Sequence, residues 1–232
     1  MQWGTSFLVT LVIGGSLLFK SSGELPRWAG PFMATGVVVF SMFLMIGFAA
    51  NQFGFDRDGF RAVVLAPIDR WQVLLGKNLA ALPPAAASTI VLLIVLAVWI
   101  GLPVLVVIAS FLQLAVGLCL TMMAGNVMSI LVPYRIQPGS MKPTKMPALA
   151  MVVMIVSQMS LPAALTPTFL PPLAGYLSGR YGGPDPSLVN FLLSVVLAAA
   201  MASIYWWSLG PLGRLLQRRE TMILATVSVD VE

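Results

Sequence analysis

The chain has 232 residues, of which 59% are hydrophobic and only 9% are charged, and its mean hydropathy is +0.94. Soluble domains are about 45–50% apolar and about 25% charged, so this composition excludes an ordinary soluble domain. It predicts an all-α fold, that of a polytopic helical membrane protein. Residues 90–100 do not alternate between apolar and polar side chains, which excludes a lipid-facing β-barrel.

Six apolar segments are expected to span the membrane within a single transmembrane domain, residues 1–232. The first is short, because a bilayer about 30 Å thick needs roughly 20 residues. The third and fourth meet at Gly101-Leu102-Pro103, a tight helical turn. Prolines break up the end of the fifth, so residues 161–172 are predicted to form a re-entrant or extracellular gate region. The predicted spans are residues 5–19, 30–50, 84–100, 103–132, 147–170 and 188–212.

A charged segment, residues 51–82, lies between the second and third spans, and we call it the elbow. It holds seven of the 21 charged side chains in the chain, so it cannot cross the bilayer. It either lies at the membrane surface or docks a soluble partner. The seven are Asp56, Arg57, Asp58, Arg61, Asp69, Arg70 and Lys77.

The elbow is predicted to contain two helices separated by a turn. Asp56 and Asp58 suit the first turn of the first helix, where negative charge meets the positive end of the helix dipole. Pro67 ends that helix, because the residue before a proline is driven out of helical geometry. Asp69 is then a natural N-cap for the second helix, residues 70–82.

Three further features are expected to shape the elbow. Gly54 would provide a hinge between two phenylalanines. Pro83 and Pro84 would break or kink the second helix before the third span. The first helix would have a charged side and an apolar side. The charged side comprises Arg57, Asp58 and Arg61, and the apolar side comprises Phe60, Val63 and Val64.

The basic residues predict how the chain is oriented, because Lys and Arg accumulate in cytoplasmic loops. With the N-terminus inside, the cytoplasmic segments hold ten of the 13 basic residues. Both termini and the elbow are therefore expected in the cytoplasm. The net charge of +5 is then a membrane-surface effect, and we expect no nucleic-acid partner.

The end of the sixth span is expected to sit at the membrane interface. Three aromatic residues there suit an interfacial belt, and three arginines beyond them can reach lipid headgroups. In the C-terminal tail, residues 213–232, the part from residue 221 on has a strand-like composition and is predicted to be a flexible end or a docking strand. The aromatic residues are Tyr205, Trp206 and Trp207, and the arginines are Arg214, Arg218 and Arg219.

The predicted spans contain no ionisable Asp, Glu, Lys, Arg or His, which argues against proton-driven transport. Without histidine, a phosphate-loop motif or metal-ligand spacing, we expect no enzymatic activity, no catalytic residue, no metal site and no cofactor bound by this chain. Neutral polar residues in the spans either join helices or line a translocation path. The path candidates are Gln113, Asn126, Ser129, Ser157 and Gln158.

Three groups of residues in the elbow carry a resemblance to a known family: Asp56-Arg57-Asp58-Gly59-Phe60-Arg61, Leu65-Ala66-Pro67, and Arg70 with Leu74-Leu75-Gly76-Lys77-Asn78. With them the chain resembles the ABC-2 type transporter permeases, the membrane subunits of ATP-binding-cassette exporters. The resemblance implies six spans, cytoplasmic termini, a bacterial plasma (inner) membrane and a coupling helix between spans two and three. It also implies that a separate ATPase subunit uses ATP.

The same resemblance implies which residues dock the ATPase, and it leaves the assembly open. Many family members have a glutamate in the coupling helix, a role that here could fall only to Asp56 or Asp58. The chain resembles one six-span half, so it is either a half-transporter that dimerises or the C-terminal half of a longer permease. The implied docking residues are Asp56, Arg57, Asp58, Gly59, Phe60, Arg61, Pro67, Asp69, Arg70 and Lys77.

Our leading hypothesis is therefore a permease subunit that exports an amphiphilic or lipid-like substrate, together with a second permease half and an ATPase. One alternative is a membrane scaffold or assembly subunit without a transport path. Another is a membrane-embedded enzyme that modifies lipid, which would need an acid–base pair near the membrane surface. If the chain were a scaffold, charge reversal in the elbow would leave ATP-dependent transport unchanged.

Overall fold

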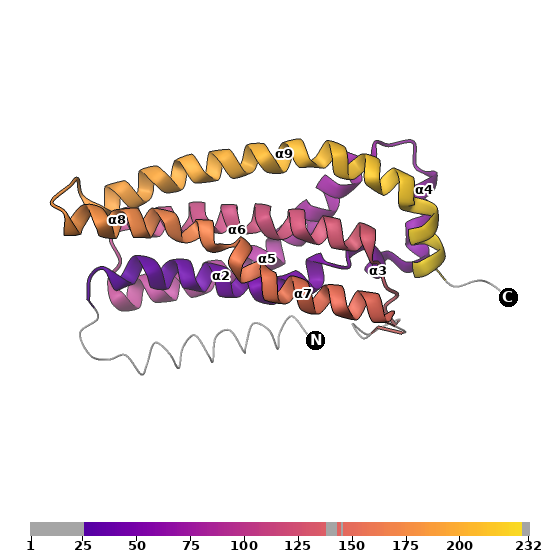
Figure 1. Ribbon diagram of the computed structural model, residues 1–232, viewed down its shortest axis with the longest axis horizontal. Helices are drawn as coiled ribbons and strands as arrows, with labels where there is room; N and C mark the ends of the chain where they lie inside the picture. Colours follow the sequence, from indigo (N-terminus) through magenta and orange to yellow (C-terminus); the bar gives the residue numbers. More distant parts are fainter. Residues whose placement is uncertain (1–25, 138–142, 145, 229–232) are drawn as a thin grey trace. The chain divides into compact units, whose positions relative to one another are not determined.

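The computed structural model describes residues 26–137, 143–144 and 146–228. Within these ranges every regular element is a helix, as the composition predicts, and the only ladder pairing is an isolated bridge between Ile136 and Pro143. Figure 1 shows the helices in chain order. They are α2 (Ala29–Ala49), α3 (Gln52–Asp56), the 3₁₀ turn η1 (Arg57–Gly59), α4 (Phe60–Leu65), α5 (Arg70–Ile100), α6 (Val104–Leu131), α7 (Ala148–Ala164), the 3₁₀ turn η2 (Thr166–Phe169), α8 (Leu170–Arg180) and α9 (Pro186–Val227).

In the described part of the chain, five helical stretches are long and apolar enough to cross a membrane, which is consistent with a multi-pass membrane protein. Each overlaps one of the last five predicted spans, and three of them extend at least ten residues beyond it at one end. The predicted first span, residues 5–19, lies outside the described residues. The five stretches are Ala29–Ala49, Arg70–Ile100, Val104–Leu131, Ala148–Arg180 and Pro186–Val227.

Two predicted helix boundaries are wrong. The second elbow helix does not end at residue 82, because α5 continues through Pro83 and Pro84 to Ile100. The tail is not a strand or an irregular end as far as Val227, because α9 extends to that residue. Its β-branched residues Ile223 and Val227 are fully buried at helical spacing, and this packing outweighs their strand propensity.

The proline-rich region after the fifth predicted span interrupts the helix only briefly. Pro162 is accommodated inside α7, and the regular helix then gives way to η2 before α8 begins. Pro171 lies in the first turn of α8, where the missing backbone N–H costs nothing. The regular α-helix is thus interrupted only at residues 165–169, and a re-entrant or gate role for residues 161–172 stays a prediction.

The described helices divide into two compact units, and each is considered by itself. Unit one comprises the described residues up to 44, residues 83–120 and residues 162–203. Its turn between α5 and α6 depends on Gly101, whose φ of 64° is in the left-handed region that favours glycine. Its helix α9 is capped by Asp185, whose carboxylate accepts a hydrogen bond of 2.9 Å from the Leu188 N–H.

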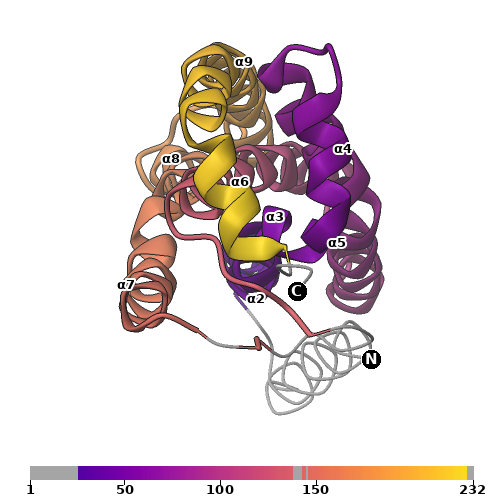
Figure 2. The same cartoon turned by 90° about the vertical axis from the view of Figure 1, so that its right-hand side faces the viewer.

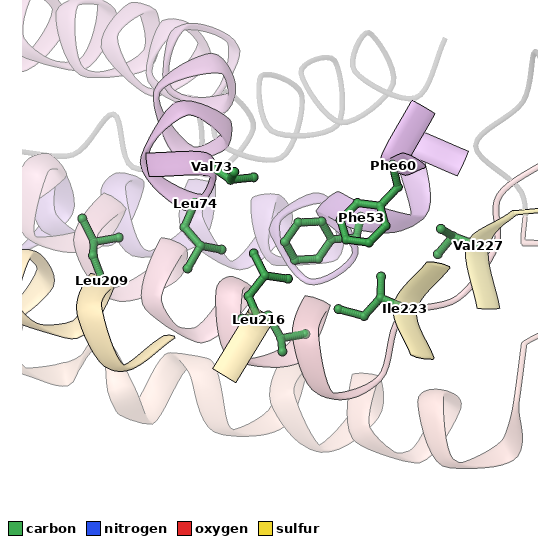
Figure 3. Packing of buried hydrophobic residues seen from close by; sticks show 9 residues of the cluster. Phe53, Phe60, Val73, Leu74, Leu209, Leu216, Ile223 and Val227 are labelled. Atoms are coloured by element: carbon green, nitrogen blue, oxygen red, sulfur yellow. The ribbon is translucent and has the colours of Figure 1, made fainter. Parts of the chain in front are cut away.

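Unit two comprises residues 45–82, 121–161 and 204 onward, and it contains the whole elbow. The C-terminal end of α9, yellow in Figures 1 and 2, lies against the short helices α3 and α4. Between them is a cluster of buried apolar side chains, most of which Figure 3 labels. The cluster consists of Phe53, Phe60, Val73, Leu74, Ile130, Leu209, Leu216, Ile223 and Val227.

Candidate functional site

The elbow begins at Asn51 and α3, which side-chain hydrogen bonds fix to the end of α6 and to the segment after it. The Asn51 amide donates to the Tyr134 carbonyl at 2.8 Å and accepts from the Tyr134 N–H at 3.1 Å. The Phe53 N–H, one of the unpaired donors at the start of α3, donates to Ser129 Oγ at 3.1 Å. Burial raises the pKa of the Tyr134 phenol, an effect that its contact with Asn51 only partly offsets.

Gly54 is required for close packing and not for an unusual backbone angle. A Cβ at this position would overlap the Asn51 amide and the Tyr134 carbonyl. Its φ is not positive, in contrast to that of Gly101. The conformational freedom expected of Gly54 as a hinge is therefore not used, because Gly54 lies buried inside α3.

A charged pair closes the other end of α3. Asp56 is the last residue of this helix. The predicted position in a first turn is therefore wrong for Asp56. At this end of α3 the helix dipole disfavours a negative charge, and Lys77 Nζ compensates for it at 2.5 Å from Asp56 Oδ2. The same ammonium lies 3.5 Å from the Gln52 carbonyl oxygen and 5.2 Å from the centre of the Phe53 ring.

The chain then bends sharply into α4. Arg57 has a φ of 48° and a ψ of −129°, a conformation that a residue with a Cβ adopts only when its surroundings enforce it. The two sides expected for the first elbow helix are found only in part, across η1 and α4, because Arg57, Val63 and Val64 are all half-buried. Phe60 is fully buried and stacks edge-on against Phe53 at 5.2 Å between ring centroids, whereas Asp58 and Arg61 are exposed.

The turn between α4 and α5 follows the predicted chemistry. Helix α4 ends at Leu65, and Ala66, the residue before Pro67, is extended with a ψ of 133°. Asp69 stands directly before α5, at the predicted N-cap position, and its carbonyl accepts from the Gln72 N–H at 3.0 Å, while its carboxylate accepts from the Trp71 indole at 3.3 Å.

Arg70 holds this turn together with hydrogen bonds in several directions. Its Nη1 donates to the carbonyls of Val63, Ala66 and Ile68 at 3.0–3.2 Å, and its Nη2 donates to Val64 at 3.0 Å. Two of these oxygens are terminal carbonyls of α4 without an intrahelical partner. One guanidinium thus closes the C-terminus of α4 and the loop after it.

The third nitrogen of the Arg70 guanidinium, Nε, connects the elbow to α9. Its Nε lies 2.8 Å from Glu220 Oε2, and both side chains are largely buried, at 11% and 20% exposed. At Gly213, one helix turn earlier than Leu216, the backbones of α9 and α5 meet closely. A Cβ there would lie 2.7 Å from the Trp71 backbone nitrogen. The C-terminal part of α9 is therefore an integral part of the elbow structure.

The tip of the elbow presents apolar side chains to the surroundings. Leu65 is 83% exposed and Ile68 is 46% exposed. Asp58, Arg61, Pro67 and Asp69 are exposed as well. The exposed surface of the tip therefore combines apolar and charged side chains.

Buried amides join the elbow to the longer helices of unit two. Gln52 Nε2 donates to Asn78 Oδ1 at 3.0 Å and lies 3.5 Å from Asn126 Oδ1. Asn78 Nδ2 donates in turn to the Tyr205 hydroxyl at 2.8 Å. The network therefore links residues of α3, α5, α6 and α9.

The predicted path residues lie in different surroundings. Gln113, in unit one, is fully buried; its amide accepts from Thr35 at 2.6 Å and donates to Asn190 and Ser194 at 3.1 Å each. Asn126 and Ser129 are buried in unit two, where they contact Gln52 and Phe53. Ser157 and Gln158 are half-buried on α7. These bonds suit the role of joining helices, and a role in a path stays a prediction.

The sequence does not predict the site roles of four residues: Asn51, Gln52, Glu220 and Tyr205, which is expected instead in an interfacial aromatic belt. Asn51 and Gln52 stand at the boundary between an apolar span and the charged segment, and Glu220 is the one acidic residue of α9. Their position could have marked them as structural polar residues. Their partners are 25 to 150 residues away in the sequence, and no local pattern identifies them.

Comparisons of the chain with protein-family models, with curated proteins and with solved structures gave no match.

Proposed function

We propose that this chain is a permease subunit of an ATP-binding-cassette exporter in the plasma membrane of a bacterium, with six spans and both termini in the cytoplasm. The observation that carries the proposal is the exposed tip of a braced elbow. Leu65 and Ile68 project at a turn whose geometry is fixed by Arg70. The charges of the elbow keep this tip out of the bilayer, so a soluble partner is its most suitable cover.

The bracing supports a mechanical role for the elbow. A force on the tip would act through Arg70 on α5 and, through Glu220, on α9. Lys77 and Asp56 connect α3 to α5 in the same way. ATP-driven closure of a partner ATPase would then bias the helices between two arrangements, which is how a ligand on one subunit switches another.

The class of the transported substrate is inferred from the absence of charged residues in the predicted spans. The predicted spans hold no Asp, Glu, Lys, Arg or His, so the path is suited to an amphiphilic or lipid-like molecule. The second permease half would be either another copy of this chain or a partner half. ATP would be bound by the ATPase subunit alone.

The proposal is tested by co-purifying the full-length chain with the ATPase encoded beside it, in detergent. We expect Leu65→Asp, and separately the charge reversal Asp58→Arg/Arg61→Glu, to reduce the recovered ATPase at least about tenfold, because each places an unmatched charge in the interface. Thr221→Asp, at an exposed polar position on α9, is the matched control and should recover as much ATPase as the wild type.

Equal ATPase recovery with Leu65→Asp, Asp58→Arg/Arg61→Glu and the wild type would overturn the docking proposal. The helical content and thermal unfolding of each variant show whether it is folded. Normal ATPase recovery without ATP-dependent movement of a fluorescent phospholipid or amphiphile in proteoliposomes would instead favour a non-transporting scaffold.

A further inference from the structure

The three arginines at the end of α9 have different environments. Arg219 is turned toward the protein, and its Nη1 donates to the Leu131 carbonyl at the C-terminus of α6, at 3.1 Å. This contact closes an unpaired helix end and is structural. Arg214 and Arg218, in contrast, are exposed.

Arg214 and Arg218 share a helix face with Trp207. Positions seven and eleven residues after Trp207 return to within about 20° of its direction, because an α-helix turns about 100° per residue. Trp207 is 76% exposed, so this face is not covered by any described part of the chain. Along the helix, an exposed indole is followed after about 10 Å by an arginine, and about 6 Å later by a second one.

The orientation of Arg214 strengthens the pattern. Helical side chains lean toward the helix N-terminus, and a Cβ built on Gly210 would lie 3.8 Å from Arg214 Nη1. The guanidinium thus lies one turn back, beside Gly210 and in the direction of Trp207. Tryptophan prefers the boundary between hydrocarbon and headgroups, and the adjoining layer contains the lipid phosphates.

The positive charge on this face has no acidic neighbour on its own helix. The one acidic residue of α9 is Glu220, and its Oε2 is engaged by Arg70 at 2.8 Å. Bidentate contact between guanidinium groups and phosphate is geometrically favourable. We propose that Trp207, Arg214 and Arg218 form a site for the headgroup of an anionic phospholipid, independent of any ATPase partner.

The experiment titrates the full-length chain, in a neutral detergent, with short-chain phosphatidylglycerol, with the matching phosphatidylcholine and with inorganic phosphate, and counts bound lipid by native mass spectrometry. We expect phosphatidylglycerol to bind tightest. An arginine contributes roughly fivefold at an anionic surface, so Arg214→Gln/Arg218→Gln should lower this affinity roughly thirtyfold.

Two further variants keep the result interpretable. Arg27→Gln/Arg180→Gln removes the same number of charges from exposed positions of unit one and should bind phosphatidylglycerol as the wild type does. Arg214→Lys/Arg218→Lys keeps the charge and should retain most of the binding. About tenfold more NaCl should weaken wild-type binding, which tests the site even if the glutamine variant does not fold.

The proposal is overturned if the two lipids bind equally, if the folded glutamine variant matches the wild type, or if the control variant loses as much affinity. Equal binding of inorganic phosphate would overturn it too, because the site would then be a free-anion site. Wild-type binding that does not respond to salt would likewise rule out recognition by charge.

Discussion

Each unit of the molecule buries a group of hydrogen-bonded amides, and the two groups differ in what surrounds them. In unit one, Gln113 bonds only to other neutral side chains, Thr35, Asn190 and Ser194. In unit two, Gln52 bonds to Asn78 through its amide and receives the Lys77 ammonium at its backbone carbonyl.

Helix length explains this difference. The first N–H groups and the last carbonyls of any helix have no intrahelical partner, so long helices such as α6 satisfy most of their own backbone. Helices α3 and α4 have five and six residues, and almost all of their backbone groups are terminal. Neutral amides therefore suffice where long helices meet, whereas the elbow also uses Arg70 to bind terminal carbonyls of α4 and Lys77 to neutralise Asp56 at the end of α3.

The largest effect is expected for Arg70→Met. It leaves the Glu220 carboxylate and the carbonyls at the end of α4 without their donor, which should lower the free energy of unfolding by about 3–5 kcal/mol. Hydrogen exchange should accelerate most in residues 60–72. Arg27→Met, at an exposed position of unit one, is the control; equal exchange in the two variants would contradict a structural role for Arg70.

Gln113→Leu tests the amide group of unit one. The change removes the partner of Thr35, Asn190 and Ser194, so we expect a loss of about 1–3 kcal/mol in the free energy of unfolding, with no change in ATPase co-purification. Ser203→Ala, an exposed position on α9, should change stability by less than about 0.5 kcal/mol. Unchanged stability together with altered transport would instead indicate that Gln113 lines a path.

The smallest effect is expected for Tyr205→Phe. Only the hydroxyl that accepts from Asn78 Nδ2 is lost, so denaturant unfolding should show a loss of about 1 kcal/mol. Tyr181→Phe removes a hydroxyl from a residue that is 78% exposed and should leave stability unchanged. Identical results for the two variants would show that the amide network of unit two does not contribute to stability.

Local chemistry predicted the turn of the elbow well. The extended conformation before Pro67 and the position of Asp69 at the start of α5 both depend on residues adjacent in sequence. The same holds for the burial of Phe60, which follows from helical spacing. Composition likewise sufficed for the all-α fold and for the apolar helices.

Long-range packing limited the rest of the prediction. Arg70 pairs with Glu220 across 150 residues, and no sequence spacing signals that contact. The residues after 221 have β-branched character, yet burial of Ile223 and Val227 in the apolar cluster keeps them helical. The requirement for glycine at position 54 also has a long-range cause. The Tyr134 carbonyl, which leaves no room for a Cβ there, comes from 80 residues further along the chain.

The two prolines inside α5 have a mechanical consequence. Pro83 and Pro84 have no N–H, so the carbonyls of Leu79 and Ala80 lose their usual partners four residues on. Helix α5 nevertheless continues unbroken from Arg70 to Ile100. Its bending stiffness must therefore be lowest around residues 79–84, and thermal fluctuations should concentrate curvature there, away from both Arg70 and the turn at Gly101.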